Sequence, residues 1–408
     1  MNMKRLRARM VLTPDGPIEN AAVITKAEHI VAVGSFGDLA SVQVEKEIDL
    51  GEQLLLPGLI NAHCHLEYTI IGRSIAKTNC FTQWIQNLNS LKRFCTDEDY
   101  LAATRVGLVE LSRWGVTSVL NIASHSVPLP NFPPSSPRVW WFFELMDIRS
   151  HICVEALLDT MAALLRGRSA WIGGVGLAPH APYTVSVALY RHVKLCAERY
   201  MVPVSTHLAE TSEELEMFRD GSGPLFEFLQ GLGRNMLDCR KKSPVVLLLE
   251  EKLVPPGAIL VHMNYLEEAD WAAVHNHQGF CVVHCPKTHA YFGRERFHFD
   301  RFRWRGITTC LGTDSLASNN SLNLFEEMQL FLHEYPYVTE QEVLNMVTVY
   351  PAKAIGQAHR IGKVAPGALA DLIAIPYAGG QADACAAIIN HRRPITWRMV
   401  HGSLSTDQ

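Results

Sequence analysis

The sequence has few charged residues and no block of charge of one sign. Asp, Glu, Lys and Arg make up 19% of the 408 residues, and the formal net charge is only -4. Proteins that hold nucleic acid or anionic membranes by electrostatics carry clustered basic residues instead. We therefore expect neither nucleic acid nor a membrane as a partner, and a small molecule as the ligand. Self-association into a homo-oligomer is left open.

Long apolar runs are absent as well. The basic start, MNMKRLRARM, is not followed by the uninterrupted apolar segment of a signal peptide or a transmembrane helix. Ten cysteines occur without a CxxC pair or a regular spacing, which argues against a disulfide framework. These features predict a cytoplasmic protein with reduced thiols.

Short β-type runs occupy both ends of the chain, whereas the middle alternates apolar runs with helical patterns. Residues 1–56 and 360–408 predict one small β-sandwich built from both chain ends. Residues 57–359 contain eight strand-like runs, which is typical of parallel strands with crossover helices. We therefore predict an α/β protein with a (β/α)8 TIM-like barrel. The eight runs are LLPGLINAHCH, VTSVLNIAS, RVWWFFELM, GVGLAPHAP, VPVSTHLAE, AILVHMN, GFCVVHCP and ITTCLGTDS.

Helix signals lie between these runs. Asp97 to Trp114 is amphipathic, and Thr211 and Thr339 each precede a glutamate by three residues, which is the pattern of a capping box. The proline-rich segment 128–137 predicts a surface loop instead of a helix.

Polar residues gather at the carboxyl ends of the predicted strands, where barrels of this type carry their chemistry. Two histidines at i and i+2 on a strand point to the same side, so His63 and His65 can bind one ion together. Histidines at five of eight strand ends are hard to explain by chance among the eighteen in the chain. The strand-end residues are His63, His65, His180, His207, His262, His284 and Asp314.

Five segments resemble the amidohydrolase superfamily, above all its deaminase-related branch. They are PGLINAHCHLEYT, APHAPYTVS, STHLAET, ILVHMNYL and LGTDSLASNNSLNLFEEM. That branch includes cytosine, guanine, S-adenosylhomocysteine/methylthioadenosine and aminofutalosine deaminases, and the resemblance covers nearly the whole chain. It implies that Glu210 shuttles protons and that His262 hydrogen-bonds the hydrolytic water or the leaving group. The metal ligands that it implies are His63, His65, His207 and Asp314.

The chemistry of these residue types agrees with the resemblance. Three imidazoles and one carboxylate suit one Zn2+ ion, with Fe2+ as an alternative, and leave room for a water whose pKa falls toward ~7. Asp314 can accept the proton of that water, and Glu210 can protonate the ring nitrogen and the departing amine. Binuclear relatives bridge two metals with a lysine on the fourth strand, and GVGLAPH contains none, so we predict a single ion.

The predicted function is metal-dependent hydrolytic deamination of an adenine-type nucleoside. Hydroxide attacks the ring carbon that bears the amino group, and ammonia leaves. The segment HCPKTHAYFG is closer to aminofutalosine-deaminase-like relatives than to the His-Asn-Pro pattern of S-adenosylhomocysteine deaminases. The best guess for the substrate is therefore 6-amino-6-deoxyfutalosine, an assignment that points to menaquinone biosynthesis.

Further residues are candidates for substrate contact, each with a structural alternative. Trp84 can stack on a base or pack in the core, and the alternative for Glu210 is a carboxylate that stabilises a helix N-terminus. A packed, hydrogen-bonded histidine is the alternative for His180, and an ion pair is the alternative for Glu144 and Arg149. Cys64 lies between two ligands on the opposite face and is expected in the core. The candidate substrate contacts are His180, Glu144, Arg149, Trp84, His284 and His289.

Two other functions compete with deamination. The same metal set could hydrolyse an amide, a cyclic amide or a substituted triazine. A barrel of this kind can also serve as a binding protein without catalysis, although an intact ligand set argues against that role.

Overall fold

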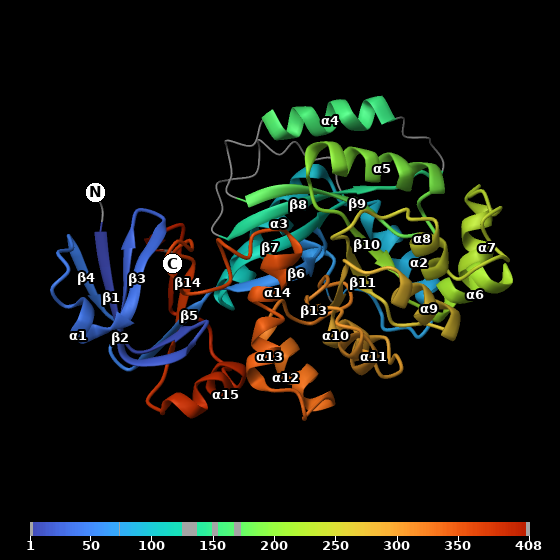
Figure 1. The fold of residues 1–408 in the computed structure, drawn as a ribbon. Coiled ribbons are helices and arrows are strands. Elements are labelled where there is room, and N and C mark those ends of the chain that lie inside the picture. Colours follow the sequence, from blue (N-terminus) through green and yellow to red (C-terminus); the bar gives the residue numbers. More distant parts are fainter. Residues whose placement is uncertain (1–2, 73, 125–136, 149–153, 167–172, 405–408) are drawn as a thin grey trace.

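A computed structural model describes residues 3–72, 74–124, 137–148, 154–166 and 173–404 of the chain (Figure 1). A sheet of terminal strands lies at one end of the molecule, and the parallel strands with their helices make up the rest. Arg149 and residues 128–136 of the proline-rich segment lie outside the described residues.

The terminal sheet combines strands from both ends of the chain. Its order is β16-β15-β14-β5-β1-β2-β3, and β4 pairs with β1. The antiparallel pairing of β5 with β14 joins the two ends. The strands form one continuous hydrogen-bonded sheet, where the sequence suggested a sandwich. Their bounds are β1 (Met3–Thr13), β2 (Gly16–Lys26), β3 (His29–Ser35), β4 (Lys46–Asp49), β5 (Gln53–Pro57), β14 (Leu372–Pro376), β15 (Trp397–Val400) and β16 (Ser403–Leu404).

Two parallel four-stranded sheets form the centre, in the orders β6-β7-β8-β9 and β10-β11-β12-β13. Each of the eight predicted runs overlaps one of these strands, so the α/β class with parallel strands is confirmed. Single parallel bridges connect the sheets at two edges, Leu177 with Val204 and Cys64 with Asp314. The bounds are β6 (Leu59–Cys64), β7 (Val116–Ala123), β8 (Arg138–Leu145), β9 (Gly173–Pro179), β10 (Ser205–Leu208), β11 (Ile259–His262), β12 (Cys281–His284) and β13 (Thr309–Leu311).

Helices connect the parallel strands and begin where the capping residues predict. Thr211 and Thr339 accept the backbone N–H groups of Glu214 and Glu342, at 3.1 and 3.2 Å. The predicted helix from Asp97 is also present. The helices are α1 (Phe36–Leu39), α2 (Phe81–Lys92), α3 (Asp97–Arg113), α4 (Val154–Arg166), α5 (Val187–Tyr200), α6 (Ser212–Asp220), α7 (Pro224–Gly231), α8 (Pro244–Glu250), α9 (Glu268–Asn276), α10 (Pro286–Tyr291), α11 (Phe299–Trp304), α12 (Leu324–Glu334), α13 (Glu340–Asn345), α14 (Val349–Ala354) and α15 (Ala384–Ile389), with 3-10 turns η1 (Leu66–Ile70) and η4 (Gln381–Asp383).

The main core lies between the parallel strands and their helices. Every residue of β11, β12 and β13 is buried, as expected for strands covered on both faces. Cys64 packs in this core, as predicted, and the cysteines of the described ranges are free. Within those ranges, no helix combines the length and the apolarity needed to cross a membrane.

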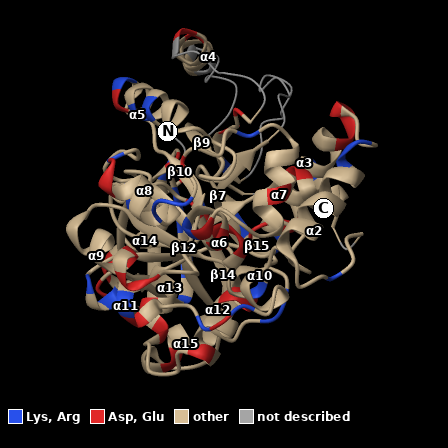
Figure 2. Cartoon of the chain, turned by 90° about the vertical axis from the view of Figure 1, so that its right-hand side faces the viewer, with Lys and Arg blue, Asp and Glu red and all other residues tan. Residues whose placement is uncertain are grey.

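A buried ion pair joins the parallel strands to the terminal sheet. Nε of Arg138, at the start of β8, lies 2.5 Å from Oδ2 of Asp371, which precedes β14. On the outer helices, basic and acidic residues are interspersed over the face seen in Figure 2. The buried polar side chains include His207, His262 and His284, at the carboxyl ends of their parallel strands.

Candidate active site

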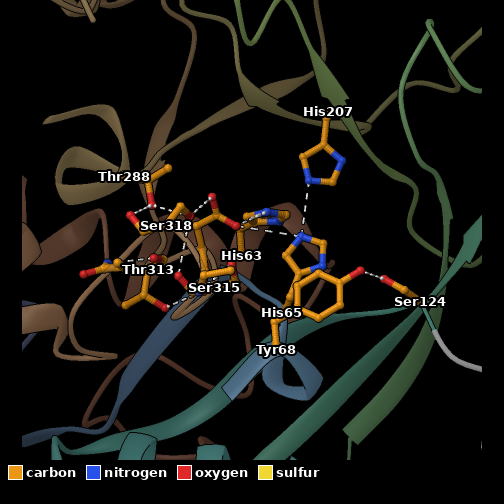
Figure 3. Close-up of polar contacts among 12 residues, drawn as sticks. His63, His65, Tyr68, Ser124, His207, Thr288, Thr313, Ser315 and Ser318 are labelled. Carbon is orange, nitrogen blue, oxygen red and sulfur yellow. Dashed lines mark hydrogen bonds and ion pairs between the residues drawn. The ribbon is translucent and has the colours of Figure 1, made fainter. Parts of the chain in front are cut away.

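Three histidine side chains meet at the carboxyl ends of the parallel strands. His63 lies on β6, His65 follows it, and His207 lies on β10 of the other parallel sheet. One ring nitrogen from each lies within 4.8 Å of the others, and the Nε2 atoms of His65 and His207 are 3.3 Å apart. Figure 3 shows the three rings turned toward one another. The i, i+2 spacing on a strand places His63 and His65 on the same side.

Asp314, just beyond β13, approaches two of these histidines. Its Oδ1 lies 3.6 Å from Nε2 of His63 and 3.8 Å from Nε2 of His65. Ser318 donates a hydrogen bond to Oδ2 at 3.1 Å. Burial alone would raise the pKa of Asp314, but its interactions with the neighbouring His63, His262 and His65 outweigh burial and lower the pKa well below its usual range. The carboxylate is therefore ionised and faces the histidines.

The backbone adopts left-handed angles at three of these strand ends. φ is +49° at Ala209, +77° at His262 and +57° at Asp314. Non-glycine residues hold such angles at a cost of about 1–3 kcal/mol each, so the surrounding structure must enforce them. The backbone N–H of Asp314, for example, donates to the carbonyl of His63 at 3.0 Å. Strain of this kind concentrated at strand ends is typical of a functional site.

The histidine cluster contains polar atoms that lack a partner among the described residues. Both ring nitrogens of His63 and Nδ1 of His65 are buried without a hydrogen bond. Burial lowers the pKa of His65 and of His207, so both imidazoles are neutral at neutral pH. Nδ1 of His207 lies 2.9 Å from the carbonyl oxygen of His180, which leaves its Nε2 facing His65. Partnerless buried nitrogens are costly, and a divalent cation fits this set of donors.

Glu210 lies beside His262, and both are buried. Oε1 of Glu210 is 3.8 Å from Nε2 of His262 and 2.7 Å from Nη2 of Arg294, which lies in the loop after α10. The side chains of Glu210 and Arg294 are only 7% and 3% exposed. Burial also lowers the pKa of His262 well below its usual range, so the imidazole is neutral. A carboxylate, a neutral imidazole and a fixed positive charge thus lie together.

Glu214, at the start of α6, fixes the backbone of the turn that ends in Glu210. Its carboxylate accepts the N–H groups of Ala209 at 3.1 Å and Glu210 at 2.8 Å. Burial raises the pKa of Glu214 to about 8. The start of α6 therefore positions Glu210 relative to the histidines.

A cavity of about 160 Å³ opens at the histidine cluster. Helices α2 and α7 give it apolar walls, which include Phe81, Ile85, Leu88, Leu225, Phe228 and Leu229. A flat aromatic ligand suits such walls. The predicted site residues that line the cavity are His65, Trp84, Glu144, His180, His207, Glu210, His262 and Asp314.

A polar corner of the cavity contains Lys92 and Tyr68. Nζ of Lys92 donates a hydrogen bond to the Tyr68 hydroxyl at 2.9 Å. The Tyr68 ring stacks on that of His65, with centroids 5.4 Å apart and an angle of 7° between the planes. The hydroxyl also lies 3.2 Å from Oγ of Ser124, as Figure 3 shows. Tyr68 therefore supports one face of His65 and links it to a cationic group.

Glu144 and His180 form a second polar group next to His207. Nε2 of His180 is 4.0 Å from Oε1 of Glu144, and its Nδ1 is 2.6 Å from Oγ1 of Thr184. One ligand atom from each of Glu144, His180 and His207 lies within 4.8 Å of the others. His207 belongs to both groups, and Glu144 and His180 both line the cavity.

His284 and His289 are not among the residues that line the cavity. The ring of His284 stacks on Phe297 with centroids 4.1 Å apart. Nδ1 of His289 is 3.2 Å from Oδ1 of Asn264, and its Nε2 is 2.5 Å from the carbonyl oxygen of Glu295. Contact of these histidines with substrate stays a prediction.

Sequence reasoning did not identify Tyr68, Lys92, Glu214 or Arg294. Tyr68 follows His65 by three residues in HLEYT, so proximity along the chain could have indicated it. Glu214 was recognised only as a capping residue. Lys92 and Arg294 come from segments whose position relative to the histidines depends on tertiary packing.

Imidazoles and a carboxylate brought together at the ends of parallel strands are the donor set of a metal-dependent hydrolase. The sequence profile of the amidohydrolase family matches residues 54–396, and the chain belongs to this family. Zinc is bound in a solved structure of similar fold, the atrazine chlorohydrolase of Arthrobacter aurescens TC1, with a TM-score of 0.80 at 19% identity over 98% of this chain and 94% of that one.

Two further comparisons concern deaminases. A 5-methylthioadenosine/S-adenosylhomocysteine deaminase of Pyrococcus furiosus is 30% identical over 364 residues, which cover 85% of this chain and 77% of the relative. The aminofutalosine deaminase of Helicobacter pylori, solved with methylthio-coformycin, has a TM-score of 0.83 at 20% identity and covers 98% of this chain and 100% of its own. The structural likeness concerns the fold, and the predicted deaminase-related branch of the amidohydrolases is confirmed.

Proposed function

We propose that this chain hydrolytically deaminates an adenine-type nucleoside with the help of one divalent metal ion. The observation that carries the proposal is the convergence of imidazole nitrogens from His63, His65 and His207 within 4.8 Å, beside the Asp314 carboxylate. Glu210 and His262 line the same cavity. The deaminase activity named for the Pyrococcus relative supports this reaction.

The metal would be held by His63, His65, His207 and Asp314. Zn2+ is the first choice for three imidazoles and a carboxylate, and Fe2+ is the alternative. Such an ion, when bound, makes water acidic enough to supply a nucleophile at neutral pH. The two parallel sheets together would form the closed eight-stranded barrel that presents these ligands, with the bridges at Leu177 and Cys64 at its seams.

The other residues move protons and orient the substrate. Asp314 accepts the proton of the attacking water on its carboxylate. Glu210 gives its proton to the ring nitrogen, takes the proton of the newly added hydroxyl group and passes it to the departing amine, and the proton held by Asp314 then restores Glu210. Glu210 lies next to the histidine cluster, and its Oε2 makes no hydrogen bond to the described residues. His262 hydrogen-bonds the water or the leaving group.

The cavity walls favour a purine-like ring with a polar substituent. Trp84 and the apolar residues of α2 and α7 would pack against the ring, and Glu144 and His180 would bind its polar edge or the ribose hydroxyls. The leading candidate is 6-amino-6-deoxyfutalosine. Lys92 lines the cavity and could bind a substrate carboxylate. Among named relatives, 5-methylthioadenosine and S-adenosylhomocysteine are the next candidates.

An ammonia-release panel with metal analysis of the same sample tests the proposal. The panel contains 6-amino-6-deoxyfutalosine, 5-methylthioadenosine, S-adenosylhomocysteine, 5'-deoxyadenosine and adenosine. Deamination of at least one, lost on chelation and restored by Zn2+ or Fe2+, is the expected result. His207→Ala should abolish activity and metal retention. His277→Ala should preserve both, because Nδ1 of His277 lies 2.9 Å from the carbonyl oxygen of Ala273 in α9. Metal-loaded protein that releases ammonia from none of these nucleosides would refute deamination.

Hydrolysis of a triazine, an amide or a cyclic amide is the alternative on the same metal site. The likeness of the fold to that of an atrazine chlorohydrolase is the reason to test a chlorotriazine as well. Chloride release from a chlorotriazine, without ammonia release from any nucleoside, would select this alternative.

A further inference from the structure

The carboxylate assigned to proton transfer is held by a buried arginine. Nη2 of Arg294 lies 2.7 Å from Oε1 of Glu210, and the side chains are 3% and 7% exposed. Nε2 of His262 lies 3.8 Å from the same oxygen. Both neighbours therefore engage Oε1, and Oε2 makes no hydrogen bond within the described ranges.

The two members of the pair have different access to the cavity. Glu210 lines the cavity, whereas Arg294 is not among its lining residues. Arg294 thus contacts Glu210 from the protein side, and a ligand in the cavity meets the carboxylate from the other side. A charge-assisted hydrogen bond of this length restricts the rotation of a carboxylate that is otherwise free to turn about its terminal bond.

Arg294 packs on an aromatic residue that contacts the walls of the cavity. Its guanidinium carbon lies 4.6 Å from the centroid of the Phe292 ring. Phe292 in turn makes edge contacts with Phe81 and Trp84 of α2, at centroid distances of 5.9 and 5.5 Å. The arginine, the proton-carrying carboxylate and the helix that lines the cavity therefore form one packed unit.

We propose that Arg294 is a positioning residue for Glu210. It holds Oε1 so that Oε2 faces the substrate, and its fixed positive charge compensates the carboxylate each time Glu210 gives up its proton. This inference rests on the proposed deamination, in which Glu210 carries protons to the ring nitrogen and to the departing amine. It predicts that Arg294 affects the chemical step more than substrate binding.

A second buried ion pair provides a matched control. Arg138 and Asp371, at the junction with the terminal sheet, have side chains 6% and 3% exposed, and Arg138 is not among the lining residues of the cavity. A purely structural role for Arg294 would make its loss resemble the loss of Arg138. A positioning role would separate the two variants in kcat.

The experiment compares R294M, R294K and R138M as full-length, metal-loaded enzymes. We expect R294M to lower kcat about 100-fold, since misplacement of a reacting group by ~1 Å has an effect of that size, with KM within about threefold. R294K should restore kcat at least about tenfold relative to R294M, because a cation is restored without the planar guanidinium group. R138M should lose stability and retain kcat, and all three variants should retain metal. Equal kcat in wild type and R294M, or a rise in KM with kcat unchanged, would overturn the inference.

A crystal structure of R294M tests the positioning without activity. We expect the Glu210 carboxylate to rotate away from the place it has beside Arg294, while His63, His65 and His207 stay in place. An unchanged Glu210 would overturn the inference even in an active enzyme. A different outcome is that the wild-type enzyme deaminates none of the nucleosides while Glu210 still rotates in R294M. In that case the proposed function fails and the positioning by Arg294 stands. If R294M fails to fold, the same comparison is made with R294K, in which a displaced carboxylate and a reduced kcat are expected.

Discussion

The side chain of Asn61 donates a hydrogen bond from Nδ2 to Oγ1 of Thr313 at 2.7 Å, and so ties β6 to the segment that carries Asp314. Its Oδ1 accepts the backbone N–H groups of His63 at 3.3 Å and Thr313 at 3.2 Å. Asn61 is fully buried. One amide therefore sets the distance between the histidine strand and the aspartate that belongs to the other parallel sheet.

Replacement of Asn61 should weaken metal binding without removing a ligand. We expect Asn61→Ala to lower the affinity for Zn2+ about 10- to 100-fold, as is usual when residues that orient metal ligands are lost. The buried N–H groups left without a partner should also lower the free energy of unfolding by about 1–3 kcal/mol. Competition with a chelator and urea unfolding measure the two effects. Asn390→Ala, at an exposed site, is the control, and wild-type zinc affinity in Asn61→Ala would contradict the prediction.

The close approach of Gly312 to His63 gives a second prediction. A Cβ atom at position 312 would lie 2.9 Å from Cβ, N and O of His63, so the backbone of one of the two must shift. We expect Gly312→Ala to separate Asp314 from the histidines and to lower kcat about 100-fold. Metal content after dialysis should fall in parallel. Gly231→Ala, where no atom lies within 4 Å, should leave both quantities unchanged. Normal metal content and rate in Gly312→Ala would refute the proposed strain.

The parallel strands could be predicted because of their burial on both faces. Such strands leave continuous apolar runs, as in β11 and β12, which the sequence displays directly. The i, i+2 spacing of His63 and His65 likewise predicted that their rings share a side. The expected position of functional residues at the carboxyl ends of barrel strands, together with the family resemblance, predicted that His207 and Asp314 lie beside them.

The remaining site residues depend on contacts between segments far apart in the chain. Arg294 and Glu210 are separated by 84 positions, and Asn61 and Thr313 by 252, so no local pattern marks either pair. His284 and His289 are a different case, because they belong to a histidine motif at a strand end and yet are not among the residues that line the cavity. Their rings are engaged by Phe297 and by the carbonyl of Glu295.

Glu213 links the start of α6 to the helix that lines the cavity. Its carboxylate accepts the backbone N–H groups of Phe81 at 2.7 Å and Thr82 at 2.9 Å, and so caps α2, whose own N-cap residue makes no side-chain hydrogen bond. In Glu213→Gln, the amide NH2 would face one of these donors. A lost cap costs about 0.5–2 kcal/mol, which should raise KM about 2- to 30-fold through displacement of Trp84 and its neighbours.

The rate of the chemical step separates this effect from a disturbed metal site. In Glu213→Gln we expect kcat within about twofold of wild type, because α2 supplies none of the proposed metal ligands. Steady-state kinetics with the best substrate of the nucleoside panel provide both constants. Glu227→Gln, at an exposed position of α7, is the control. A fall in kcat with unchanged KM would contradict the assignment of Glu213 to substrate positioning.

Glu327, on α12, should make stability depend on pH. The residue is fully buried, and burial raises its pKa to about 8 from an ordinary 4.5, against hydrogen bonds from the backbone of Lys287 and the side chain of Asn319. The folded state therefore binds a proton more tightly than the unfolded state does. Its contribution to stability is complete below pH ~4.5 and is lost as the pH rises through about 8.

Comparison of wild type with Glu327→Gln isolates this group, because the amide does not titrate. The free energy of unfolding of wild type minus that of Glu327→Gln should decrease between pH 5 and pH 9, by an amount on the order of a few kcal/mol. Urea unfolding at pH 5, 7 and 9 measures it, and Glu227→Gln should show no such trend. A difference that stays constant over this range would mean that Glu327 has the same proton affinity in the folded and unfolded states. A difference that grows with pH would mean that the carboxylate form is the one that the folded protein stabilises, against the direction that burial dictates.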